Sequence, residues 1–341
     1  MIGLVDEKVL RDNNISVLKS EKDCTVYKMQ DVSGEGTMTW YKVFPGIYLS
    51  YNDFHMETCC SAFKRETDIL TIDHCRQGRI EWELSKNRYM YLQEGDLFIN
   101  SKDYQAVGFG FPIKHYHGIT VIIYINEALH FEKSILEEFS IDLKSLHKAF
   151  TSGEGLLFMR SMASIEHIFS ELYTVSPEIR NHYLKIKVLE LLLFLSAFEI
   201  SMQGSERPYL PKNQVQKAKA IMKYMTDHID EHFTLEELSL RFKVSLATMK
   251  SCFKGVYGTS IYSYMRMHRM HIAAKMLKEN DERITTIASK VGYSNILNPQ
   301  NLGFWKPTFF VGSFFFYLYL FKLLLLCTLN KGLTFKWQLF S

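Results

Sequence analysis

The segment 234–254 most constrains the fold of this chain, because its apolar residues repeat with a helical period that one short turn interrupts. Leu235, Leu238 and Phe242 recur at intervals of three and four residues and so share one helix face. A threonine precedes that face as an N-cap, and two glutamates follow in the first turn. Val244 is an apolar residue inside the turn, as expected if it fills the angle between two helices. The segment therefore predicts two short helices joined by a tight turn.

The second of these helices has two contrasting faces. Ser245 can cap it, and Leu246, Met249 and Phe253 form a new apolar face. The opposite face is small, hydroxyl-bearing or basic, which suits a helix that enters the major groove of DNA. The predicted DNA-binding residues are Ala247, Thr248, Lys250, Ser251 and Lys254. On periodicity alone, two helices of an ordinary bundle with a solvated face would give the same pattern.

Residues further along the chain favour the DNA-binding interpretation. Phe253-Lys254 ends the second helix and Tyr257-Gly258 follows it, and a pattern I-x-x-I-A-x-x-V-G-Y-x-N begins at Ile284. Between them, a long predicted helix carries Tyr264, Arg269, Ala273, Ala274 and Leu277. In these positions the segment resembles the DNA-binding domain of the AraC/XylS family of transcription regulators. The resemblance is strong from Lys212 to Asn295 and stops there.

The resemblance implies a double helix-turn-helix unit that binds double-stranded DNA. Its core would comprise Leu235, Leu238, Phe242, Val244, Met249, Phe253, Ile284, Ile287, Ala288 and Val291. It also implies a cytoplasmic homodimer that responds to a small-molecule effector and is not an enzyme. It leaves RNA polymerase open as a further partner.

The charge distribution agrees with a nucleic-acid partner. Residues 212–295 hold 14 Lys and Arg against 8 Asp and Glu, while the whole chain has a net charge of only +3. Residues 1–211 are therefore acidic. A basic segment behind an acidic one is typical of a DNA-binding domain joined to a domain with another task. A chance asymmetry of this size is the alternative.

The N-terminal part reads as β-structure from residue 40 to about residue 126. In Arg79–Leu84 apolar and charged residues alternate, which predicts a strand with one buried and one wet face. Ile119–Ile125 is nearly all apolar, as in a strand buried on both faces. Short strands with frequent turn signals predict a small barrel or jelly roll. This part resembles the cupin-like sensor domain of the same family, and the fold class is therefore α+β.

A cupin-like barrel could instead hold a metal ion. His115 and His117 have the spacing of two ligands on one strand, and His74 and Glu81 could complete a set. The glycine-spaced cupin motif is not visible around His115, so we assign no metal and no cofactor and keep His115 and His117 as secondary candidates. A cupin-type metal- or ligand-binding protein is the alternative function. The six scattered cysteines form no C-x-x-C, which suits a reducing cytoplasm.

Helical periodicity continues from residue 127 to about residue 200. Leu156–Tyr173 is expected to be helical, and Pro177 is expected in the first turn of a further helix. The run Leu191–Leu195 makes that helix apolar around much of its circumference, so it packs on the barrel or also meets a second subunit. The predicted layout is a sensor at 1–126, a helical dimerisation region at 127–200, a linker at 201–212 and an incomplete DNA-binding domain at 213–295.

The remaining residues, 296–341, depart from the family pattern. The 46 residues contain no Asp or Glu, and Pro299 and Pro307 would break a second recognition helix. We interpret them as an aberrant hydrophobic tail from a frameshifted or truncated gene end, which would weaken DNA binding. The alternative is a membrane-tethered regulator, because Phe309–Leu329 spans 21 residues with only Lys322 charged.

Overall fold

The computed structural model describes residues 10–11, 14–59, 69–84, 87–100, 108–131, 133–151, 156–197, 209–279 and 282–293. Contacts divide the chain into two compact units: residues 1–220 with 242–261, and residues 221–241 with 262–341. The tail, its 309–329 stretch and most of the expected linker lie outside the described residues.

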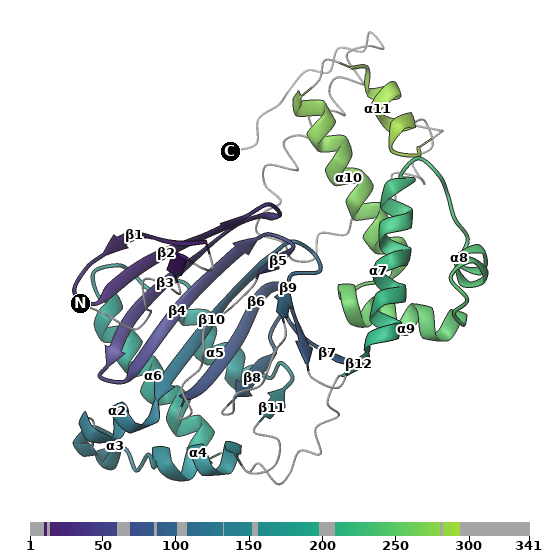
Figure 1. The fold of residues 1–341 in the computed structure, drawn as a ribbon. Coiled ribbons are helices and arrows are strands. Elements are labelled where there is room, and N and C mark those ends of the chain that lie inside the picture. The colour runs from purple at the N-terminus through teal and green to yellow at the C-terminus, as the bar shows by residue number, and fades with distance from the viewer. Residues whose placement is uncertain are drawn as a thin grey trace, which may run out of the picture. The chain divides into compact units, whose positions relative to one another are not determined.

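The first unit is built on antiparallel strands, drawn purple to blue in Figure 1. Strands begin at Ile15, earlier in the chain than predicted. They are β1 (Ile15–Ser20), β2 (Cys24–Asp31), β3 (Gly34–Phe44), β4 (Ile47–His55), β5 (Thr58–Cys59), β6 (Ile69–Leu84), β7 (Arg88–Gln93), β8 (Leu97–Asn100), β9 (Gly108–Gly110), β10 (Tyr116–Tyr124), β11 (Leu156–Met159) and β12 (Leu210–Pro211).

The long strand β6 organises the sheet. The strand order is β1-β2-β3-β4-β10-β6-β7-β12; the first half of β6 also pairs with β8 and its second half with β9. Gly78 lies between the halves with a φ of 86°, and a Cβ there would lie 2.2 Å from the carbonyl oxygen of His115. Only glycine tolerates this bend. One strand thus serves both parts of the sheet, as in a jelly roll, and the α+β class is confirmed.

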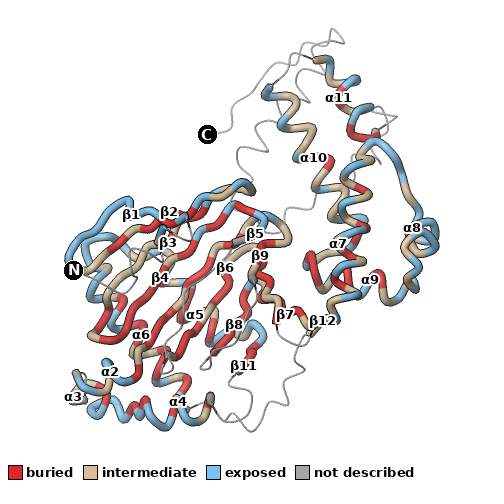
Figure 2. Tube along the Cα trace, viewed as in Figure 1, coloured by how far each residue is buried: buried red, intermediate tan, exposed pale blue. Residues whose placement is uncertain are grey.

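Two apolar cores lie on opposite faces of these strands. Leu49, Ile72 and Ile119 belong to the core that the helices α5 (Ala163–Leu172) and α6 (Arg180–Ala197) cover. Phe54, Phe111 and Tyr116 belong to the second, aromatic-rich core. Figure 2 shows the central strands as largely buried. The alternation of side chains along a strand explains the division, since neighbouring residues point to opposite faces.

The helical region before residue 200 differs in two places from the prediction. Leu156–Met159 is not helical but forms β11, paired with β8, and α6 begins at Arg180 rather than at Pro177. A short apolar run fits a buried strand as well as a helix, so periodicity could not decide the first case. The other helices are α2 (Ile125–Phe131), α3 (Lys133–Glu138) and α4 (Leu143–Thr151).

The prediction that one face of β6 is exposed to solvent is also wrong, because Arg79 and Glu81 are both buried. Glu81 accepts hydrogen bonds from the Tyr91 hydroxyl and from Lys219, each at 2.5 Å. Arg79 donates to Gln93 and to the backbone carbonyl of Gly255. Buried charges need such partners, because each leaves water at a large free-energy cost. Alternation in the sequence cannot reveal a face that polar partners cover.

The C-terminal helices are α7 (Lys212–Asp227), α8 (Leu235–Arg241), α9 (Leu246–Tyr257), α10 (Ile261–Glu279) and α11 (Ile284–Lys290). Of these, α9 belongs to the first unit, α8 and α11 belong to the second, and the unit boundaries cut α7 and α10. Within the described ranges, no helix combines the length and apolarity that crossing a membrane requires.

Candidate nucleic-acid interface

The start of α8 is fixed by a reciprocal pair of hydrogen bonds. The Glu237 backbone N–H donates to the Thr234 hydroxyl at 3.2 Å, and the Thr234 backbone N–H donates to the Glu237 carboxylate at 2.8 Å. The bond from the Thr234 amide lowers the pKa of Glu237 below its ordinary value. This is a capping box, which satisfies two amides that a helix start leaves unpaired. The sequence predicted the threonine cap but not its partner.

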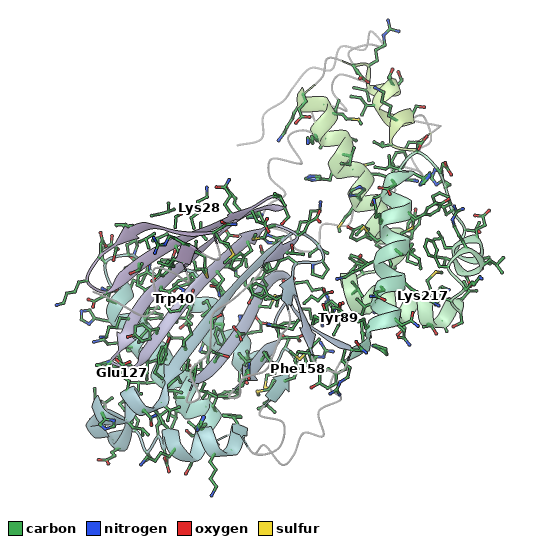
Figure 3. All side chains as sticks on the ribbon, viewed as in Figure 1. Lys28, Trp40, Tyr89, Glu127, Phe158 and Lys217 are labelled. Carbon is green, nitrogen blue, oxygen red and sulfur yellow. The ribbon has the colours of Figure 1, made fainter. Side chains whose placement is uncertain are left out.

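The turn before α9 lies where the sequence predicted it. Lys243 adopts a left-handed φ of 48°. Its carbonyl oxygen accepts a hydrogen bond of 2.8 Å from Nζ of Lys217, a residue of α7 that is labelled in Figure 3. Ser245 then caps α9, because its hydroxyl accepts the Thr248 backbone N–H at 3.2 Å. The predicted cap is confirmed, and α9 starts at the expected residue.

The two faces of α9 are as predicted. Met249 and Phe253 are buried, whereas Ala247, Lys250, Ser251 and Lys254 are exposed and Thr248 is half-buried. Neither Lys250 nor Lys254 forms an ion pair with another described residue. The exposed side of α9 thus presents two cations, one hydroxyl and a small side chain, which can approach a groove without steric obstruction.

The end of α9 explains the aromatic–glycine pair of the sequence motif. Gly258 is the C-cap with a left-handed φ of 77°, and its N–H donates to the Lys254 carbonyl at 2.8 Å. Tyr257 is buried and packs on the Phe253 ring, with centroids 4.5 Å apart. Glycine stops the helix because it alone adopts this backbone conformation at little cost.

In the second unit, a glycine and an arginine fix the residues after α11. Gly292 has a φ of 81°, and a Cβ there would meet the carbonyl oxygens of Asp230 and Ile229 at 2.9 and 3.0 Å. Its own carbonyl accepts a bond of 2.6 Å from His232. Arg269 is buried and donates to the carbonyl of Glu231. Three positions of the quoted family pattern, Arg269, Gly292 and Tyr293, therefore lie together, with Arg269 over the Tyr293 ring at 6.0 Å.

The predicted core residues differ in how far the protein covers them. Leu238, Met249, Phe253, Ile287 and Val291 are buried, and the remaining members are partly covered, namely Leu235, Phe242, Val244, Ile284 and Ala288.

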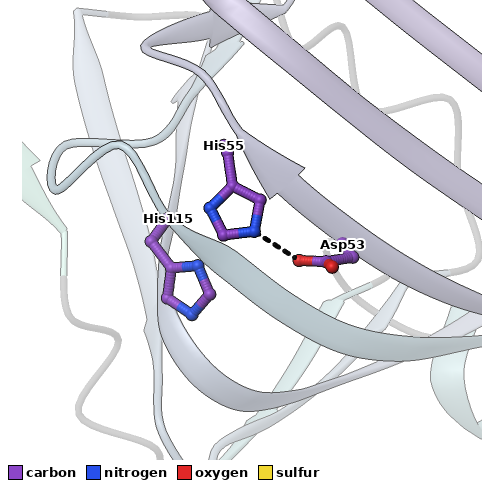
Figure 4. Close-up of side chains that lie close together, drawn as sticks. All are labelled: Asp53, His55 and His115. Atoms are coloured by element: carbon purple, nitrogen blue, oxygen red, sulfur yellow. Dashed lines mark ion pairs between the residues drawn. The ribbon is translucent and has the colours of Figure 1, made fainter. Parts of the chain in front are cut away.

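The suggested metal set does not assemble as proposed. His74 is buried against Phe169, and Glu81 bonds Tyr91 and Lys219. The His117 ring packs edge-on against Tyr173. Instead, His115 lies beside Asp53 and His55, two residues that the sequence analysis did not select (Figure 4).

Comparison with known proteins identifies the type of domain that the C-terminal segment forms. Residues 238–297 match the model of a helix-turn-helix domain. The chain carries an AraC-type helix-turn-helix domain. A stretch of 137 residues is also 21% identical to the HTH-type transcriptional activator RhaS of Klebsiella pneumoniae, over 39% of this chain and 47% of the relative. The match thus spans about half the length of that relative.

Solved structures give only distant likenesses. ToxT from Vibrio cholerae aligns over 82% of this chain and 90% of its own, at 11% identity and a TM-score of 0.28. The AraC-like transcriptional activator CuxR aligns over 79% and 89%, at 10% identity and the same score of 0.28.

Proposed function

We propose that this chain is a sequence-specific DNA-binding transcription regulator that responds to a small-molecule effector. The observation that carries the proposal is the exposed face of α9, where Lys250 and Lys254 lie opposite the buried Met249 and Phe253 in an AraC-type domain. A cation without a protein partner is free to neutralise a DNA phosphate. The effector part of the proposal rests on the resemblance of the N-terminal β-structure to the cupin-like sensor domain of the family.

The test is a salt titration, because it needs no knowledge of the operator. Binding to a random-sequence duplex is followed by fluorescence anisotropy for the full-length chain and for the double variant Lys250→Ala, Lys254→Ala. Log K falls linearly with log salt, and each lost phosphate contact makes this negative slope shallower by about 0.9. We therefore expect the magnitude of the slope to decrease by about 2 for the double variant. The charge-matched control Lys22→Ala, Lys144→Ala removes two exposed lysines elsewhere and should leave the slope unchanged. Equal slopes for both double variants would remove α9 from the interface.

We also propose that the aberrant tail weakens this binding. The family pattern would continue after Asn295 with a second recognition helix, whereas residues 296–341 lack acidic residues and contain two prolines. A separate binding measurement at a selected operator therefore compares the chain with a version in which a family-like second recognition helix replaces this tail. Tighter binding by the replaced chain, by roughly 2–6 kcal/mol at a selected operator, is the expected result. Equal affinity would show that the tail is a working part, and a chain found in the membrane fraction would favour the tethered alternative.

The domain layout remains a proposal, with the sensor at 1–126, the helical region at 127–200, the linker at 201–212 and the DNA-binding domain at 213–295. A homodimer through α6 fits this layout. Ile186 and Leu193 are seven residues apart on α6 and remain 60% and 46% exposed, although Val188 and Leu192 on the same helix are buried. Apolar side chains at this spacing form one stripe that a second copy could cover.

We expect Ile186→Glu to convert a dimer into a monomer, since a carboxylate would be buried in the interface. Analytical ultracentrifugation measures the mass in solution. The control Val32→Glu changes a fully exposed apolar residue in the β2–β3 hairpin, and it should leave the mass unchanged. A dimer that survives Ile186→Glu would place the interface elsewhere.

A further inference from the structure

Three potential metal ligands converge at one end of the β4–β10 pair. Asp53 and His55 are two residues apart on β4, and His115 immediately precedes β10. The register pairs His117 with Asp53 and Tyr116 with Phe54, so His115 falls beside His55. One ligand atom of each of Asp53, His55 and His115 lies within 4.8 Å of the others (Figure 4).

The alternation of side chains places this cluster on the face opposite the aromatic core. Phe54 and Tyr116 belong to that core and point one way, so their neighbours in sequence point the other way. Tyr51, two residues before Asp53, lies on the helix-covered face and its hydroxyl donates to the Leu172 carbonyl at 2.8 Å. The cluster therefore continues the helix-covered face beyond the end of α5. It shares no residue with the aromatic-rich core or with the predicted DNA-binding face of α9.

The residues of the cluster are only partly engaged with one another. His55 Nε2 and an Asp53 carboxylate oxygen are 3.1 Å apart, and the His55 and His115 rings lie 4.9 Å apart at an angle of 32°. Among the described residues, Nδ1 of His115 is buried and has no hydrogen-bond partner. A buried nitrogen without a partner is costly, and a metal ion would satisfy it.

The donor set and the spacing suit a transition metal better than an alkaline-earth ion. Two imidazoles and one carboxylate are common ligands of Zn²⁺ and its neighbours, whereas Ca²⁺ and Mg²⁺ prefer oxygen alone. Ligand atoms around tetrahedral Zn²⁺ are about 3.4 Å apart, because each metal–ligand bond is about 2.1 Å. The side chains of Asp53 and His55 are 50% and 60% exposed, so they are free to close the remaining distance.

We propose that Asp53, His55 and His115 bind one divalent transition-metal ion, with Zn²⁺ as the first probe. The three ligands leave at least one coordination position open to water or to a small anionic ligand. The ion would join β4 to the chain segment that leads into β10, and so stabilise this end of the β4–β10 pair. Such a site lies outside the DNA-binding function proposed above and does not depend on it.

The experiment titrates Zn²⁺ into the full-length chain without an affinity tag, by calorimetry and by thermal unfolding. We expect one ion per chain and an increase in Tm of about 5 °C when the metal is in large excess over Kd. Asp53→Asn and His115→Gln should each weaken binding by at least about 100-fold, because each removes a direct ligand. The matched control His130→Gln changes an exposed histidine on α2 and should leave binding unchanged.

Co²⁺ distinguishes this site from the cysteines of the chain. Bound by nitrogen and oxygen donors, Co²⁺ shows its visible ligand-field bands without a thiolate charge-transfer band, and this spectrum should disappear in His115→Gln. A thiolate band would overturn the proposal. So would the absence of Zn²⁺ binding, a preference for Ca²⁺, or binding that Asp53→Asn and His115→Gln leave unchanged. Because Asp53 is half exposed, a folding defect in that variant is not expected, and the circular dichroism of each variant verifies this.

Discussion

The sheet and the C-terminal helices use their polar residues in opposite ways. In the sheet, His74, Arg79 and Asp96 are buried, and their partners are side chains or backbone groups of the same unit. In the helices, polar side chains such as Ser245 bond the backbone at helix ends, while Lys250 and Lys254 remain exposed. These polar residues of the sheet are therefore committed to partners within the protein. In the helices, polar residues fix backbone conformation and leave charge available for a partner.

The largest effect that would sharpen this comparison is expected at Gly292. Gly292→Ala places a side chain at a left-handed φ and against two backbone carbonyls. We expect the local free energy of unfolding to fall by about 3 kcal/mol, because the substitution combines backbone strain with overpacking. Hydrogen exchange of the α11 amides measures the local stability, and Ser289→Ala, an exposed change on the same helix, is the control. If both variants exchange alike, backbone conformation is not what fixes this region.

A smaller effect is expected from unpairing a buried charge in the sheet. The Asp96 side chain is 1% exposed and accepts a bond of 2.8 Å from Arg160, which is 55% exposed. Arg160→Ala should therefore lower the free energy of unfolding by about 2 kcal/mol, less than the removal of a fully buried partner would. Lys250→Ala, on the exposed face of α9, should stay within about 0.5 kcal/mol of the wild type. Urea unfolding compares the two, and equal losses would break the contrast between sheet and helices.

Acid should weaken the sheet through His74. Burial lowers the pKa of His74 to about 3, from the ordinary value of 6.5 that the unfolded chain retains. Between these values the unfolded chain binds a proton that the folded chain does not. Stability is therefore lost as the pH falls below 6.5, by up to about 1.4 kcal/mol per pH unit.

Urea unfolding at pH 7.5 and pH 5 should show a smaller acid sensitivity for His74→Phe than for the wild type. His167→Gln, an exposed histidine on α5, is the control and should behave like the wild type. An unchanged acid sensitivity in His74→Phe would mean that His74 is protonated in the folded sheet.

Local patterns in the sequence predicted the capped helices well. The Thr234 and Ser245 caps, the buried face of α9 and the glycines at positions 258 and 292 follow from rules that act over a few residues. The strand over Arg79–Leu84 was also predicted, because alternation of apolar and charged residues is local. The strand β11 was not, since its partner β8 lies more than fifty residues away in the sequence.

By itself, the sequence determined the α+β fold class and the helix-turn-helix motif of the C-terminal segment, because hydrophobic period, caps and a spaced motif are properties of neighbouring residues. Only the tertiary structure decided that Arg79 and Glu81 are buried and that Asp53, His55 and His115 meet. Pairing of β4 with β10 brings the three potential metal ligands together across some sixty residues of sequence. Burial and side-chain proximity depend on which strands pair, and no local pattern encodes that choice.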